Sequence, residues 1–183
     1  MPKDMTRETE KDADTRKPVF RKPEAEDGSD IWNLVRACKP LDENSMYCNL
    51  IQADHFSDTC VVAELDGEIV GWISGHIIPG ENAFFVWQVA VGEKARGLGL
   101  GKRMLKHLIS RDGCEEVNLL KTTITKSNDA SWGLFRSFAR SIGGELTHEP
   151  HFEKEAHFDG QAATEHMLSI TIPRKRSELR AVA

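Results

Sequence analysis

The fold is decided by AFFVWQVAV at residues 83–91 and by RGLGLG at residues 96–101. The first stretch is almost entirely apolar and rich in aromatic and β-branched side chains, which predicts a strand in the centre of a sheet. The second places three glycines ahead of apolar residues that recur at helical spacing over residues 100–109. Because a helix N-terminus offers free N–H groups, this order of strand, glycine loop and helix predicts a site for a phosphate or pyrophosphate.

Two common phosphate-binding loops do not fit the glycine pattern. A Walker loop needs glycine where Arg96 stands, and serine or threonine where Arg103 stands. A dinucleotide-binding loop needs the spacing G-x-G-x-x-G and an acid about 20 residues further on. Here the spacing is G-x-G-x-G, and residues 119–121 carry no acid. The glycine loop is therefore either a ligand-free tight turn or a site for a different phosphate compound.

The remaining pattern predicts a single α/β (α+β) domain with a mixed, mostly antiparallel central sheet flanked by helices. Apolar residues at helical spacing predict helices over residues 30–38, 46–53 and 129–142, the first capped by Ser29 or Asp30. Asp66-Gly67 predicts a hairpin turn. The expected strands are a short first one near residue 19, then 60–65, 68–75, 83–91, 117–125 and 165–172.

Composition limits the function classes. The 183 residues carry a net charge of −5, which argues against a nucleic-acid-binding surface. No apolar run approaches the roughly 20 residues of a membrane span, so we expect no membrane partner and a cytoplasmic location. The four cysteines are scattered, which indicates reduced thiols and no metal site. We expect a polar, disordered leader over residues 1–17, the domain over 18–173 and a charged tail over 174–183.

The loop resembles the acyl-CoA signature of the GCN5-related N-acetyltransferases (GNAT), through its pattern Arg-x-x-Gly-x-Gly after a strand. The resemblance implies that loop residues hold the CoA pyrophosphate, namely Arg96, Gly97, Gly99 and Gly101. It also implies that backbone groups of Val89 and Val91 bind the pantetheine arm, and that an N–H near Val89 polarises the thioester carbonyl.

A second element of the GNAT pattern lies at the start of the helix expected from residue 129. The resemblance implies that Asn128, Ser131 and Phe135 contact the pantetheine arm. Many GNAT members carry a tyrosine at the position of Phe135, where it protonates the leaving thiolate. Phenylalanine has no proton to give, so this chain lacks the usual acid.

Several segments resemble the diaminobutyrate acetyltransferases of ectoine synthesis more closely: FRKP at 20–23, PLDENSMY at 40–47, WQVAVGEKARG at 87–97, TTIT at 122–125 and NDASWGLFR at 128–136. This resemblance implies acetyl transfer from acetyl-CoA to the 4-amino group of L-2,4-diaminobutanoate, by direct attack in a ternary complex. The product is the precursor of an osmoprotective solute. The resemblance also implies a cytoplasmic homodimer.

Three side chains suit a substrate with two ammonium groups, and each has an ordinary structural alternative. Asp42 could pair with an ammonium group or cap the second helix. Tyr47 could contact substrate or protonate the thiolate, or could be a half-buried aromatic. Trp87, expected on the same strand face as Val89, could form a cation–π wall or belong to the core.

The catalytic base and the acceptor remain open. Asp42, Glu81 and Glu93 are candidate bases. The resemblance implies a histidine shortly before Glu165, but Ala162 stands at the matching position, between His157 and His166. The alternatives to diaminobutanoate are another amine, an amino acid or a protein N-terminus. A third possibility, suggested by Phe135, is an acyl-CoA-binding sensor without chemistry.

Overall fold

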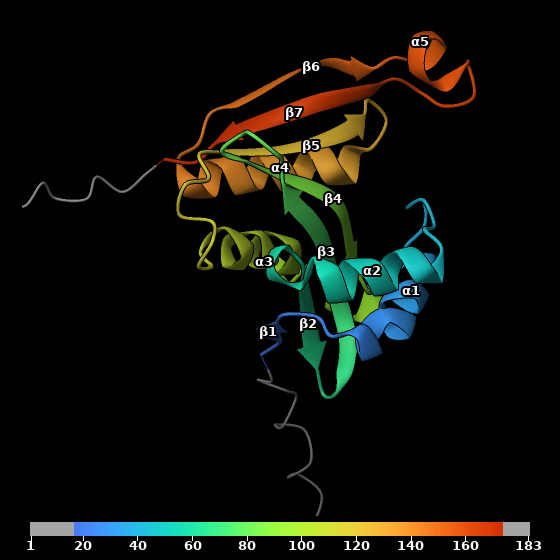
Figure 1. Ribbon diagram of the computed structural model, residues 1–183, viewed down its shortest axis with the longest axis vertical. Coiled ribbons are helices and arrows are strands. Elements are labelled where there is room, and N and C mark those ends of the chain that lie inside the picture. The colour runs from blue at the N-terminus through green and yellow to red at the C-terminus, as the bar shows by residue number, and fades with distance from the viewer. Residues whose placement is uncertain (1–16, 174–183) are drawn as a thin grey trace, which may run out of the picture.

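A seven-stranded sheet with helices on both faces forms the body of the protein (Figure 1). The computed structural model describes residues 17–173, so all but the last residue of the leader predicted over residues 1–17, and the tail predicted over 174–183, lie outside the described residues. The sheet order is β1-β2-β3-β4-β5-β7-β6, and only β4 and β5 are parallel. The predicted mixed, mostly antiparallel sheet is confirmed.

The elements follow one another in the order of the chain. The strands are β1 Val19–Arg21, β2 Val61–Leu65, β3 Glu68–Ile77, β4 Ala83–Val91, β5 Leu119–Thr125, β6 Leu146–Phe152 and β7 Glu165–Thr171. The α-helices are α1 Gly28–Ala37, α2 Met46–His55, α3 Leu100–Ile109, α4 Asp129–Ile142 and α5 Lys154–Phe158. Short 3-10 turns lie at Ala25–Asp27, Ser57–Thr59 and Glu93–Ala95.

The first strands of the sheet are apolar on both faces because both faces are covered. In β2, Val61 and Ala63 belong to the core beneath α3 and α4, whereas Val62 belongs to a second core with residues of α1 and α2. β3 alternates in the same way, with Ile73 in the first core and Trp72 in the second. Helices therefore pack on both sides of β2, β3 and β4, as the continuous apolar run of β4 predicts.

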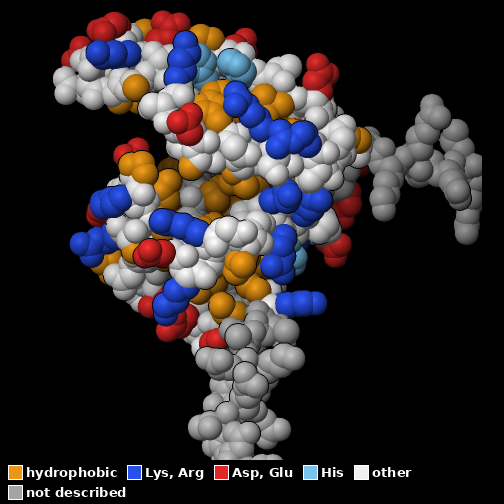
Figure 2. Space-filling view, turned by 180° about the vertical axis from the view of Figure 1, so that it is seen from behind, with side chains coloured by type: hydrophobic (Ala, Val, Ile, Leu, Met, Phe, Trp, Pro, Cys, Tyr) orange, Lys and Arg blue, Asp and Glu red, His pale blue; other side chains and the backbone are white. Residues whose placement is uncertain are grey.

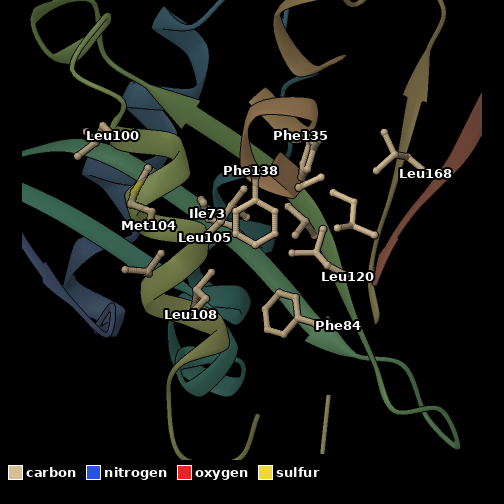
Figure 3. Packing of buried hydrophobic residues seen from close by; sticks show 14 of the residues in the cluster. Ile73, Phe84, Leu100, Met104, Leu105, Leu108, Leu120, Phe135, Phe138 and Leu168 are labelled. Carbon is tan, nitrogen blue, oxygen red and sulfur yellow. The ribbon is translucent and has the colours of Figure 1, made fainter. Parts of the chain in front are cut away.

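The larger core joins α3 and α4 to the sheet. Leucine and methionine side chains of α3 and two phenylalanines of α4 meet strand residues from β3, β4, β5 and β7 (Figure 3). Phe138, Met104 and Leu105 are fully buried. The strand–loop–helix unit is thus fixed to the sheet, which places the glycine loop at one end of a rigid helix.

β4 and β5 part along their length. They pair only through Ala83–Leu119, Phe84–Leu120 and Phe85–Lys121. β4 then continues with β3, and β5 continues with β7. Because the two strands separate beyond Phe85, the sheet opens into a cleft in its middle.

Most predicted elements are confirmed, and β4 and α4 have the expected ends. The predicted cap of α1 is wrong. The N-cap is Asp27, not Ser29 or Asp30, because the 3-10 turn before α1 runs directly into the helix. β6 and α5 were not expected from the sequence. Their side chains are almost all exposed, so the sequence carries little apolar periodicity there.

Candidate active site

A cavity of about 460 Å³ lies where β4 and β5 part. Residues 86–89 of β4 form one wall and residues 122–125 of β5 form the other. The loop between α1 and α2 contributes Pro40, Leu41, Asp42 and Asn44, and the start of α4 and of β7 contribute Asn128, Ser131, Phe135 and Glu165. Seen from behind, the molecule is notched between the β5–β7 end and the body that carries α1 and α2 (Figure 2).

Six of the predicted site residues line this cavity: Asp42, Trp87, Val89, Asn128, Ser131 and Phe135. The loop between α1 and α2 lies over it. Tyr47 lies outside the cavity lining, on the first turn of α2, and 71% of its side chain is exposed. Val91 and the predicted pyrophosphate-binding residues also lie outside the lining, toward the N-terminus of α3.

A β-bulge shapes the β4 wall. Ser74 of β3 faces Gln88 and Gly75 faces Val86, so Trp87 is an extra residue without a partner position. Val86 and Val89 pack against the same core although they are three residues apart. The prediction that Trp87 shares a face with Val89 is therefore wrong, because the bulge breaks the alternation on which it rested. Trp87 lines the cavity with 54% of its surface exposed.

The glycine loop presents free backbone N–H groups at the N-terminus of α3. Gly99 is the N-cap of α3 with φ of 65°, and Gly97 has φ of 79°, conformations that favour glycine. A Cβ at either position would meet open space. The first N–H groups of α3 have no intrahelical acceptors, so they point out of the helix end. The side chain of Arg96 donates from Nε to the carbonyl of Val91 at 3.3 Å, which ties the loop to the end of β4.

Gly101 has a different role from the other two loop glycines. A Cβ there would lie 3.2 Å from a methyl group of Leu134 in α4. Gly101 thus lets α3 approach α4 closely.

Asn128 both caps a helix and lines the cavity. Its Oδ1 accepts a hydrogen bond from the backbone N–H of Ser131 at 3.1 Å, which begins α4. Because capping engages Oδ1, the amide nitrogen is the group that could donate to a ligand. Phe135, one helical turn beyond Ser131, supplies apolar surface to the same wall.

Two carboxylates face the cavity from opposite ends of the chain. Asp42 lies in the loop between α1 and α2, and Glu165 begins β7. Burial raises the pKa of Glu165, a hydrogen bond from Thr123 lowers it, and the charge of Asp42 raises it again. Glu165 was not predicted as a site residue. The sequence shows an acid at the first position of a predicted strand, but only the pairing of β7 with β5 brings Glu165 to the cavity.

The other candidates for proton transfer lie elsewhere. Glu81 is paired with Lys121 at 2.5 Å, and Glu93 is exposed in the turn before the glycine loop. His166 is 4% exposed, and burial, then Lys126 and His148, lower its pKa. Nδ1 of His157 accepts from the backbone N–H of Glu153. Of the three predicted bases, Asp42 alone lines the cavity.

Residues 17–173 contain neither a metal-binding cluster nor a membrane-spanning helix. No group of three or more histidine, cysteine, aspartate or glutamate side chains within this range is arranged to hold a metal ion. None of the helices in this range has the length and hydrophobicity needed to cross a membrane.

Known proteins are similar to this chain in sequence and architecture. Residues 28–139 match the Acetyltransferase (GNAT) family. The L-2,4-diaminobutyric acid acetyltransferase of Methylotuvimicrobium alcaliphilum is 46% identical over 153 residues, which cover 83% of this chain and 89% of the relative. The corresponding enzyme of Vibrio cholerae is 43% identical, with 84% and 90% covered. This chain belongs to the diaminobutyric acid acetyltransferases of the GNAT family.

A solved structure supports the same assignment. The diaminobutyrate acetyltransferase EctA of Paenibacillus lautus, in complex with L-2,4-diaminobutyric acid and coenzyme A, superposes with a TM-score of 0.81. It is 38% identical, and the match covers 86% of this chain and 96% of that one. Both resemblances inferred from the sequence are therefore confirmed at the level of family and fold.

Proposed function

We propose that this protein transfers the acetyl group of acetyl-CoA to the 4-amino group of L-2,4-diaminobutanoate, by direct attack in a ternary complex. The observation that carries the proposal is the pair of carboxylates, Asp42 and Glu165, at the cavity between the parted strands. A diamino acid brings two ammonium groups and one carboxylate, so two acidic side chains match its charge. Membership of the diaminobutyric acid acetyltransferases supports the same acceptor.

The acetyl-CoA side of the site follows from the fold. The N-terminus of α3 and the loop of Arg96, Gly97 and Gly99 suit the pyrophosphate, because free N–H groups and the helix dipole converge there. The pantetheine arm would lie between Val89 of the β4 wall and the start of α4, with Asn128, Ser131 and Phe135. Val91, two residues beyond Val89 in β4, would meet the arm on its way to the glycine loop. A backbone N–H at Val89 would polarise the thioester carbonyl.

The acceptor side holds the amine against that carbonyl. Asp42 and Glu165 bind the ammonium groups, and the exposed face of Trp87 gives a cation–π wall. The attacking ammonium group first loses a proton to water, with Asp42 as the candidate base at the cavity. The neutral amine then forms the C–N bond, the C–S bond breaks, the nitrogen releases its second proton to water and the thiolate takes up a proton. Since Phe135 cannot donate, we assign that last proton to Tyr47, the only tyrosine of the chain.

The test is acetylation of L-2,4-diaminobutanoate by the purified protein with acetyl-CoA. Lysine, ornithine and spermidine serve as parallel acceptors, and mass and NMR locate the new amide. We expect acetylation at the 4-amino group, strongly preferred over the other amines. A preference for another amine would contradict diaminobutanoate as the acceptor and identify that amine in its place. CoA binding without product from any amine would support a non-catalytic acyl-CoA-binding protein.

We also propose that the protein is a cytoplasmic homodimer that supplies the precursor of an osmoprotective solute, as the resemblance implies. β6 is a surface that a second copy could cover. It ends the sheet, and six of its seven residues are exposed. Light scattering of the purified protein should give twice the mass of the chain. A monomer at all concentrations would contradict the dimer but not the activity.

A further inference from the structure

Gln88 of β4 is a buried polar side chain that lines the cavity and contacts the loop between α1 and α2. It is 8% exposed and sits beside the bulged Trp87 in β4. Its Nε2 donates to the backbone carbonyl of Asp42 at 2.9 Å, and its Oε1 accepts from Nδ2 of Asn44 at 3.4 Å. Since a carbonyl oxygen can only accept, the Asp42 contact fixes which end of the amide faces which partner.

The same loop is held from α1 on its other side. Nε1 of Trp32 donates to the carbonyl of Asn44 at 3.1 Å, and the guanidinium of Arg36 lies 4.2 Å from the centre of the Trp32 ring. Glu43 forms salt bridges with Arg36, at 3.4 Å, and with Lys39. The α1 contacts thus hold Glu43 and Asn44. The backbone carbonyl of Asp42, in contrast, accepts its hydrogen bond from Gln88.

We propose that Gln88 is a positioning residue for the acceptor amine, and that it acts by holding the backbone of Asp42 against the sheet so that the carboxylate faces the cavity. This inference rests on the proposed function for its substrate, but the contact itself belongs to the unliganded protein. The bulge explains why a polar side chain is available here. It breaks the strand alternation at Trp87 and leaves Gln88 on the side of the loop.

The inference separates Gln88 from residues that touch acetyl-CoA. Gln88 contacts the loop between α1 and α2, whereas the pantetheine-binding residues proposed at the start of α4 line the cavity from a different element, and the glycine loop lies outside the lining. Loss of Gln88 should therefore raise KM for the amine and leave KM for acetyl-CoA unchanged. A residue that merely stabilised the fold would change neither KM.

The experiment compares Gln88→Leu with Gln52→Leu. Gln52 is also a buried glutamine, in α2, and its recorded partner is Asn49. It is therefore a matched control for replacing a buried amide. We expect Gln88→Leu to raise KM for diaminobutanoate about tenfold, the size expected when a buried hydrogen bond is lost. KM for acetyl-CoA should stay within about twofold in both variants, and Gln52→Leu should leave both KM values near wild type.

A second readout needs no substrate. The indole N–H of Trp32 reports on the loop through its bond to Asn44. Gln88→Leu should shift its ¹H–¹⁵N resonance and speed hydrogen exchange at residues 42–44, and Gln52→Leu should do neither. Should Gln88→Leu fail to fold, Asn44→Ala removes one partner of Gln88 from a partly exposed loop position, and a smaller rise in the amine KM is expected.

The outcomes are distinguishable from failure of the proposed function. If the wild-type protein does not acetylate diaminobutanoate, the acceptor is wrong, but the Trp32 resonance and the exchange at residues 42–44 still test the loop. An unchanged Trp32 resonance and unchanged exchange in Gln88→Leu would overturn the inference. So would an amine KM within about twofold of wild type, or equal rises in both KM values.

Discussion

Glu165 makes binding of the amine depend on pH at the level of a single residue. Burial and the charge of Asp42 raise the pKa of Glu165, so its carboxylate is lost at a higher pH than usual as the solution is acidified. KM for the amine should therefore rise as the pH falls through this raised pKa.

Asp42→Asn should raise KM for the amine about tenfold or more and leave KM for acetyl-CoA unchanged, because the substitution removes a charge-assisted contact.

The coupling between the two carboxylates gives a sharper check. In Asp42→Asn, the pKa of Glu165 should fall, so the acid limb of the KM profile should move to lower pH. In Glu165→Gln the limb should flatten. Glu149→Gln, on the exposed strand β6, is the control for a general change of charge and should leave the profile in place. An acid limb that stays at the same pH in Asp42→Asn would argue against the coupling.

Tyr47, the proposed proton donor, lies outside the cavity lining and is largely exposed. If its hydroxyl protonates the thiolate, Tyr47→Phe should lower kcat about a hundredfold, the usual scale for a general acid. KM for acetyl-CoA should not change. The measurement is steady-state kinetics with both substrates varied, and an unchanged kcat would remove Tyr47 from this role.

Residue types with a strong local pattern were predictable, and residues placed by long-range pairing were not. Asp42, Val89 and Asn128 lie on or beside motifs that the sequence shows directly. Glu165 reaches the cavity only because β7 pairs with β5. Gln88 interrupts an apolar run in the sequence, and its role depends on a bulge that no local pattern indicates.

At the level of elements, two glycine variants separate an effect on CoA binding from an effect of backbone strain. Gly99→Glu introduces a negative charge at the N-terminus of α3, where we place the pyrophosphate. CoA affinity, measured by calorimetry, should fall about a hundredfold, since like charges at an interface cost several kcal/mol. The side chain itself would meet open space, so the variant should fold.

Gly67→Glu is the matched control for that variant. Gly67 has φ of 79°, similar to the 65° of Gly99, and a Cβ there also meets open space. It lies in the hairpin turn between β2 and β3. Both variants should lose roughly 1–2 kcal/mol of stability from the left-handed backbone. Equal loss of CoA affinity in both would show that the glycine loop does not hold the pyrophosphate.

The elements themselves were predictable in proportion to how much they bury. β4 and α4 carry dense apolar patterns, and their ends were as expected. β6 and α5 have almost no buried side chains, so their sequences carry little of the periodicity that predicts structure. β6 is a strand because β7 offers it hydrogen-bond partners over Leu146–Phe152.

The whole molecule consists of two sheet portions that meet over a short seam. β1 to β4 form one portion and β5, β7 and β6 the other, and β4 and β5 pair at only three positions. The larger core beneath α3 and α4 runs across both portions and holds them together. A ligand that enters between β4 and β5 would touch both portions, so its binding should stabilise both portions of the sheet.

Saturation with CoA should therefore stabilise the molecule as a unit. At a CoA concentration of about 100 times Kd, the free energy of unfolding should rise by about 2.7 kcal/mol, because CoA binds the folded state alone. Hydrogen exchange should slow at residues 86–91 of β4 and also at the first turn of α4, with the glycine loop, while the exposed β6 serves as the internal control. Slowing confined to α3 and the glycine loop would mean that CoA does not reach between the parted strands, and would place the pantetheine arm elsewhere.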